Sequence, residues 1–151
     1  MKILLIEPPK PLSAIGGDDV FIFEPLALEY VAAGVSAFHD VKILDLRLDN
    51  TLMPMLVDFQ PDIVGITAYT IHVNVVKNLF EQIKAWDDNI LTVVGGHHAT
   101  VVTGDFISPF IDLIVIVEGV YAFIEIAESY EIAETFDGIP GVAIVKENNL
   151  A

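Results

Sequence analysis

Short aliphatic runs alternate with amphipathic segments along the whole chain, and this alternation is the strongest constraint on its fold. The aliphatic runs are Lys2–Ile6, Val41–Asp45, Ile63–Thr67, Ile90–Val94, Asp112–Val117 and Gly141–Lys146. Helical patterns lie near residues 25–35 and at Thr51–Phe59, Val73–Trp86 and Val120–Tyr130. Runs without polar alternation are typical of strands buried on both faces. The order predicts an α/β, Rossmann-like (flavodoxin-like) fold, a doubly wound parallel sheet of about five strands with Gly141–Lys146 as an edge strand.

The composition supports one domain spanning residues 1–151. Hydrophobic residues make up 54% of the chain, which first raises the question of a membrane span. The longest uncharged stretch, Asn89–Gly104, contains three glycines and two histidines, so we expect no spanning helix. The N-terminal MKILLIE has only four apolar residues in a row before an acidic residue, too few for the apolar region of a signal peptide. With no cysteine in the chain, these features favour a cytoplasmic protein.

Charge and cysteine content exclude several functional classes. The chain has 7 Lys+Arg and 22 Asp+Glu, a formal net charge of −15. Nucleic acid and anionic lipid bind basic patches, so neither is an expected partner. The absence of cysteine removes disulfides, thiolate zinc sites and iron–sulfur ligation by this chain.

In a doubly wound sheet, ligands bind at the carboxyl ends of the strands. The loops to consider are therefore Glu7–Phe23, Ala68–His72, Gly95–Thr103 and Glu118–Val120. No GxGxxG or GxxxxGK[ST] motif occurs, so dinucleotide and P-loop sites are not predicted. The acids and lysine of a phospho-receiver and the phosphate loop of a flavodoxin are missing from these loops as well.

The pair Gly95-Gly96 follows an expected strand, and a backbone without Cβ atoms lets a ligand approach closely. A simple tight turn is the alternative explanation. The preceding strand ends at Thr67, which offers a hydroxyl, and 27 residues lie between Thr67 and Gly95.

A strand ending in Ser or Thr, then a gap of this size, then Gly-Gly resembles two of the three marks of cobalamin-binding domains. More specifically, the chain resembles the N-terminal B12-binding domain of cobalamin-dependent radical SAM enzymes, which include anaerobic magnesium-protoporphyrin monomethyl ester cyclase and the hopanoid methylases. The resembling segments are KILLIEPP, EPLALEYVAA, HDVKILDL, PDIVGITAYT, TVVGGHHAT, DLIVIVEGVYAFIEI and IPGVAIV. Two departures stand out. The Asp-x-His-x-x-Gly mark is absent after the first strand, and the Gly-Glu-Gly-Glu of the family reads Val117-Glu118-Gly119-Val120.

The resemblance implies a cobalamin held base-off, without a lower histidine from this chain. It implies that the nucleotide tail lies against Gly95 and Gly96, that Thr67 bonds it, and that Glu118 and Gly119 contact the corrin edge. The implied cofactor-binding residues are Thr67, Ala68, Tyr69, Thr70, Gly95, Gly96, His97, His98, Glu118 and Gly119. A radical SAM domain with a 4Fe-4S cluster and S-adenosylmethionine would follow residue 151. By itself the chain shows no nucleophile beside a base, so we expect it to bind rather than catalyse.

Two other functions remain open at this point. One is an interaction domain of the same fold that binds no cofactor. The other is a small-molecule hydrolase or transferase with His98 as its base, although the sequence indicates no partner for that side chain. Adjacent histidines point in different directions, so one of His97 and His98 can meet a ligand. A metal site is not predicted, because no third ligand accompanies the pair. His72 could approach a cobalt ion, but it is better explained as the first residue of a helix.

Overall fold

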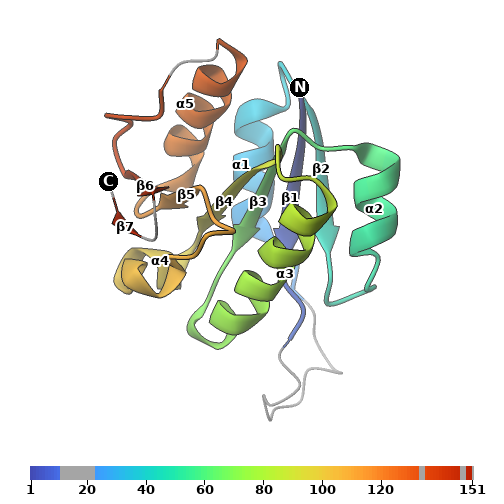
Figure 1. Ribbon diagram of the computed structural model, residues 1–151. Helices are drawn as coiled ribbons and strands as arrows, with labels where there is room; N and C mark the ends of the chain where they lie inside the picture. The colour runs from blue at the N-terminus through green and yellow to red at the C-terminus, as the bar shows by residue number, and fades with distance from the viewer. Residues whose placement is uncertain (11–22, 133–134, 147–148, 151) are drawn as a thin grey trace.

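The computed structural model describes residues 1–10, 23–132, 135–146 and 149–150 (Figure 1). Its strands are β1 (Lys2–Glu7), β2 (Asp40–Asp45), β3 (Ile63–Thr67), β4 (Leu91–Gly95), β5 (Leu113–Val115), β6 (Val142–Lys146) and β7 (Asn149–Leu150). Its helices are α1 (Leu26–Val35), α2 (Leu52–Phe59), α3 (Val73–Trp86), α4 (His97–Val101) and α5 (Gly119–Glu131), with 3-10 turns η1 (Thr70–His72) and η2 (Thr103–Phe106). The strand order is β2-β1-β3-β4-β5-β6-β7, and the first five strands are parallel.

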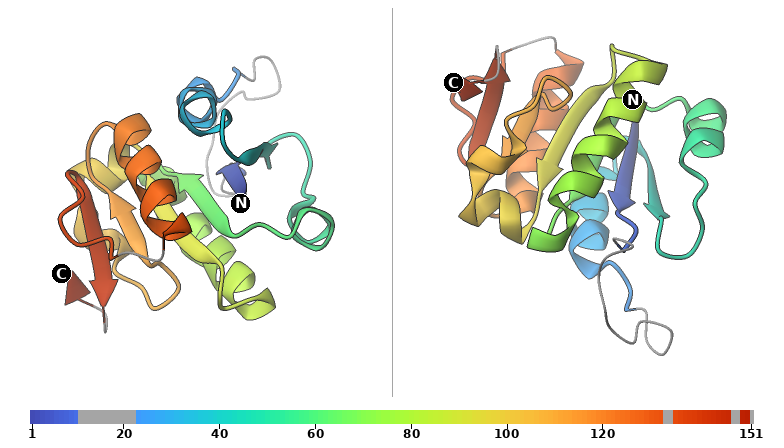
Figure 2. Two further views of the ribbon diagram at one scale, coloured as in Figure 1. Left: turned by 90° about the horizontal axis from the view of Figure 1, so that it is seen from above. Right: turned by 60° about the horizontal axis from the view of Figure 1, so that its bottom comes forward.

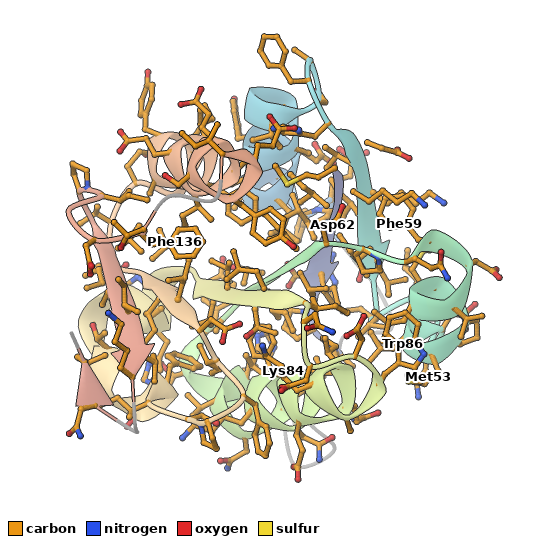
Figure 3. The ribbon with its side chains drawn as sticks, turned by 45° about the horizontal axis from the view of Figure 1, so that its top comes forward. Met53, Phe59, Asp62, Lys84, Trp86 and Phe136 are labelled. Carbon is orange, nitrogen blue, oxygen red and sulfur yellow. The ribbon has the colours of Figure 1, made fainter. Side chains whose placement is uncertain are left out.

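Helices cover both faces of the sheet (Figures 1 and 2). Because side chains alternate along a strand, β1 sends Leu4 and Ile6 to one core and Ile3 and Leu5 to the other. The first core is completed by α2, α3 and α4, and the second by α1 and α5. Figure 3 shows the two sides, with Phe136 against the α1 and α5 core and Trp86 against the α3 core. The predicted doubly wound α/β fold is confirmed.

The order in which strands are added to the sheet reverses at β1. The chain passes from β1 to β2 on one side and then crosses to β3 on the other. All carboxyl ends of the parallel strands face the same edge, which comes forward in the right-hand view of Figure 2. A crevice for a ligand is expected at this edge, beside the reversal.

Most predicted elements match the structure, and three differ from it. The fifth strand is shorter than predicted, Leu113–Val115 rather than Asp112–Val117. The sixth strand is present but runs antiparallel to β5, and it is not the predicted edge strand, because β7 pairs with it on the other side. The Gly95–Thr103 segment, predicted as a loop, contains α4, because five residues are too few to show helical periodicity. The loop Glu7–Phe23 lies mostly outside the described residues. Within the described ranges, no helix is long and apolar enough to cross a membrane.

Candidate functional site

A cavity of about 610 Å³ lies between the sheet and the helices α1 and α5. From the strands it is lined by Leu5, Gly65, Ile66, Thr67, Val93, Gly95 and Val115, and from the helices by Ala27, Leu28, Tyr30, Val31, Gly119, Val120 and Phe123. Gly96, Val117 and Glu118 complete the lining. These last three residues are exposed and follow the carboxyl ends of β4 and β5, so the cavity opens at the carboxyl edge. This is where the topology places a ligand.

The strands line the cavity in two rows, fixed by their register. The floor row consists of Leu5, Gly65 and Val93, which pair directly across β1, β3 and β4. Two residues further along, on the same face, the mouth row contains Thr67 and its partner Gly95. Thr67 carries a hydroxyl, whereas the floor row is wholly apolar. The cavity is therefore polar at its opening and hydrophobic at its base.

Gly65 lets the side chains of Leu5 and Phe123 pack against the backbone of β3 at the floor of the cavity. A Cβ at this position would lie 2.9 Å from Leu5 Cδ2 and 3.1 Å from Phe123 Cε2. A glycine in the middle of a buried strand often marks a place where another group approaches the backbone closely. This residue was not among the predicted site residues, although its position inside Ile63–Thr67 is visible in the sequence.

The turn at Gly96 joins the loop after β4 to the loop after β3. Ala68 N–H donates to the Gly95 carbonyl at 2.8 Å, and His98 N–H donates to the Ala68 carbonyl at 3.0 Å. Gly96 has φ 98° and ψ −177°, a conformation that only glycine adopts readily. A Cβ there would lie 2.6 Å from Thr67 Oγ1 and 2.8 Å from Ala68 N. Only glycine therefore allows the two loops to meet at the mouth of the cavity.

His98 is fixed by hydrogen bonds at both ring nitrogens. Nδ1 lies 3.1 Å from Thr70 Oγ1, and Nε2 lies 2.8 Å from Asp105 Oδ2. With an ionised Asp105 accepting at Nε2, the neutral ring carries its proton there, so Nδ1 accepts from the Thr70 hydroxyl. The residue is 6% exposed, and its ring contacts Phe106 edge-on at 5.8 Å between centroids, while His97 is exposed. The two histidines thus diverge as expected.

The expectation that His98 has no partner is wrong. Asp105 and Thr70 hold it, because α4 and η2 of the connection between β4 and β5 lie against the turn η1 that follows β3. The arrangement ties these loops to one another. Since both ring nitrogens are engaged, neither is free to bind a metal ion or to face the cavity as a base.

A second polar group lies at the carboxyl ends of β1 and β2. Arg47 is the only arginine of the chain and donates two hydrogen bonds to Asp45, at 2.8 and 2.6 Å. These bonds lower the pKa of the Asp45 carboxyl. Burial raises the pKa of Glu7, an effect that the charge of Arg47 partly offsets. The group stabilises this edge of the sheet beside the cavity rather than within it.

His72 is the N-cap residue of α3, in agreement with its explanation as a helix-start residue, although its side chain makes no capping hydrogen bond. Burial lowers the pKa of its imidazole, and the nearby charge of Arg47 lowers it further. Its Nδ1 is buried and makes no hydrogen bond within the described residues. The side chain contacts Tyr69 edge-on, with 6.0 Å between ring centroids.

The structure brings half of the predicted cofactor-binding residues together. Lining the cavity are Thr67, Gly95, Gly96, Glu118 and Gly119. Beside its mouth, but outside its lining, are Ala68, Tyr69, Thr70, His97 and His98. Their contact with a cofactor stays a prediction. The apolar floor and the helix residues of the lining were missed, because in the sequence they look like ordinary core positions.

Comparison with known proteins identifies the family. Residues 12–127 match the family model described as the B12 binding domain. An uncharacterized methyltransferase of Pyrococcus horikoshii is 36% identical over 98% of this chain, and the match covers 33% of that protein. The hopanoid C-3 methylase of Methylococcus capsulatus is 29% identical over 94% of this chain, covering 28% of the methylase.

Among solved structures, the radical S-adenosylmethionine methyltransferase TsrM of Kitasatospora setae, with cobalamin and a [4Fe-4S] cluster bound, superposes with a TM-score of 0.81 at 21% identity. The match covers 99% of this chain and 30% of TsrM, and at this identity it establishes a common fold. The chain spans about a third or less of the length of each of these three proteins. The predicted resemblance is confirmed, and the chain belongs to the B12-binding domain family.

Proposed function

We propose that this chain binds cobalamin in the base-off form, with the corrin ring at the carboxyl edge of the sheet and the nucleotide tail in the cavity. The observation that carries the proposal is the 610 Å³ cavity between the sheet and the helices α1 and α5, which opens beside Gly95 and Gly96. A cavity of this kind, polar at the mouth and apolar at the floor, matches a tail whose ribose and phosphate are polar and whose base is largely apolar.

The residues at the mouth fit the polar part of the tail. Thr67 is buried, yet its hydroxyl makes no hydrogen bond to the residues that the structure describes. The hydroxyl is not among the fully buried atoms without a partner, so water can reach it at the mouth of the cavity, and a ligand oxygen or nitrogen would replace that water. Gly95 leaves open space at the same level, since the nearest atom to a Cβ there would be Val115 Cβ at 3.6 Å. Thr67 would bind the tail, and Gly95 would let it pass close to the backbone.

The surface around the mouth fits a flat macrocycle. Tyr69, Ile71 and Val117 are large apolar side chains, and all three are exposed at the carboxyl ends of β3 and β5. Exposed apolar groups that cluster at one edge are typical of a binding surface. The net charge of −15 is compatible with this ligand, because the side chains of the corrin ring are mostly neutral amides.

The proposal assigns no lower histidine ligand to the cobalt. His98 would have to break its hydrogen bonds to Thr70 and Asp105 to bind a metal ion. The Asp-x-His-x-x-Gly mark that supplies such a histidine in other cobalamin proteins is absent from the loop after β1. In this reading His98 and its partners hold the loops at the mouth in place and do not touch the cobalt.

We also propose that the chain forms the cobalamin-binding part of a longer radical SAM enzyme. The support is that it covers 33%, 28% and 30% of the three proteins it was compared with, one of them a radical S-adenosylmethionine methyltransferase with a [4Fe-4S] cluster. In such an enzyme the bound cobalamin supplies methyl transfer or radical chemistry, and a separate domain binds the cluster and S-adenosylmethionine. The residues of this chain bind and orient the corrinoid.

Absorbance spectroscopy tests the proposal. The chain is mixed with cob(II)alamin or hydroxocobalamin, desalted, and its spectrum recorded, and the same is done with the longer protein that contains it. Retained corrinoid with a base-off spectrum is the expected result. A base-on spectrum would contradict the placement of the tail. If neither protein retains corrinoid, the proposal fails and an interaction domain without a cofactor becomes the better explanation.

A further inference from the structure

Among the residues that the structure describes, none offers a hydrogen-bonding group to a ligand at the floor of the cavity. The floor row of Leu5, Gly65 and Val93 is apolar, and Phe123 of α5 closes it from the other side. β3 lies between β1 and β4, so the backbone groups of Gly65 belong to the hydrogen-bond ladder of the sheet. Any polar atom that reaches the floor therefore loses water without gaining a partner.

The polar side chains of the lining lie away from the floor. They are Tyr30 and Glu118, which are both exposed, and Thr67 of the mouth row. A ligand can therefore form hydrogen bonds near the opening, but its deepest part must be apolar to bind well.

Cobamides differ in the base at the end of the nucleotide tail. The dimethylbenzimidazole of cobalamin turns a benzene ring with two methyl groups away from the ribose. A purine such as adenine instead carries ring nitrogens and an amino group on the same side. Burial of methyl groups is favourable, whereas burial of polar atoms without partners is unfavourable.

We propose that the floor of this cavity selects among cobamides by their lower base, accepting benzimidazoles and discriminating against purines. The inference rests on the proposed function, in which the tail occupies the cavity. Leaving even one polar atom of the purine unsatisfied weakens binding about tenfold. We therefore expect cobalamin to bind at least about tenfold more tightly than adeninyl cobamide.

Absorbance titrations of the chain with cobalamin, adeninyl cobamide and cobinamide test this selectivity. Cobinamide has the corrin ring but no nucleotide tail. Adenine leaves cobalt more readily than dimethylbenzimidazole, and this difference between the free cobamides favours the adeninyl form. A measured preference for cobalamin is therefore due to the protein. Equal affinity for the two cobamides, or tighter binding of the adeninyl form, would overturn the inference.

The same titrations distinguish a failure of the inference from a failure of the proposed function. If cobinamide binds as tightly as cobalamin, or if no corrinoid binds, the tail does not occupy the cavity and the proposed function itself is wrong. If both cobamides bind equally and far more tightly than cobinamide, the tail is bound but the floor does not select its base.

A hydroxyl introduced at the floor gives a second measurement. Val93→Thr keeps nearly the same shape and adds one hydrogen-bonding group to the floor row, so the preference for cobalamin over adeninyl cobamide should fall at least about threefold. Val94→Thr is the matched control, since Val94 is equally buried but faces the α2 and α3 core. An unchanged preference in Val93→Thr, or an equal change in both variants, would overturn the inference. The comparison of wild-type affinities stands even if a variant fails to fold.

Discussion

Replacing Gly95 by alanine should stabilise the fold while weakening cobalamin binding. The nearest atom to the new Cβ would be Val115 Cβ at 3.6 Å, an ordinary contact, and φ at Gly95 is not positive. The folded chain can therefore accept the methyl group without strain. Alanine restricts the unfolded chain more than glycine does, which stabilises a protein by about 0.4–1 kcal/mol. For a domain of this size, the melting temperature should rise by roughly 1–4 °C.

The same methyl group would occupy the mouth row of the cavity. Gly95 pairs with Thr67 on the face that lines the cavity, so its Cβ would point toward the proposed tail. Forcing a ligand against an extra methyl group costs about 1–3 kcal/mol, by analogy with overpacked protein cores. The dissociation constant for cobalamin should increase by about 5- to 150-fold.

Gly96→Ala is the contrasting variant. Its backbone conformation costs a non-glycine residue about 1–3 kcal/mol, and the Cβ would also approach Thr67 Oγ1 to 2.6 Å. The melting temperature should therefore fall by roughly 2–12 °C. Thermal melts without ligand and absorbance titrations on both variants and the wild type give the comparison. Wild-type affinity in Gly95→Ala would place the tail elsewhere, and a lower melting temperature for that variant would refute the reasoning about open space.

Three further predictions concern the groups beside the cavity. Burial raises the pKa of Glu7, so its charged form destabilises the fold at neutral pH. The variant Glu7→Gln should therefore have a higher melting temperature than the wild type at pH 7, and the difference should shrink as the pH falls toward 4.5. A less stable variant at pH 7 would contradict this. Burial and Arg47 lower the pKa of His72, so its contribution to stability is lost as the pH falls from 6.5 through the lowered pKa. In the variant His72→Phe, the free energy of unfolding measured with denaturant should therefore depend less on pH between pH 7.5 and 5. His98→Ala should destabilise the fold by about 2–4 kcal/mol, because the histidine ring is buried against a phenylalanine. Asp105→Ala should cost about 1 kcal/mol or less, because water can replace the half-exposed carboxylate. Equal losses of stability for the two variants in urea denaturation would argue against this.

The sheet could be predicted because its strands are buried on both faces. Ile63–Thr67 has no polar residue before its last position, and such a run fits a central parallel strand better than any other element. The antiparallel direction of β6 could not be predicted in the same way. It depends on how the chain returns to β5 after α5, and Val142–Lys146 has the same aliphatic character as the parallel strands.

The His98 network shows why polar contacts between loops escape sequence reasoning. Thr70, His98 and Asp105 are separated by 28 and 7 residues, spacings that carry no periodic signal. They meet only because Gly96 adopts a conformation open to glycine and starts a helix of five residues directly after the strand. The sequence indicates the glycine pair, but the helix that follows it and the partners it gathers depend on the tertiary structure.

The cavity itself divides into a predictable and an unpredictable half. Its mouth lies where strand order and loop composition place ligands, so Thr67, Gly95 and Gly96 could be identified from the sequence. Its floor is built from aliphatic side chains that differ from core residues only in facing the cavity instead of packing against other side chains on every side. Whether Val93 packs against a helix or faces open space depends on how far α1 and α5 stand from the sheet. Gly65 is the exception that the sequence shows, since a missing side chain in the middle of a buried strand often marks a close approach of another group to the backbone, here the side chains of Leu5 and Phe123.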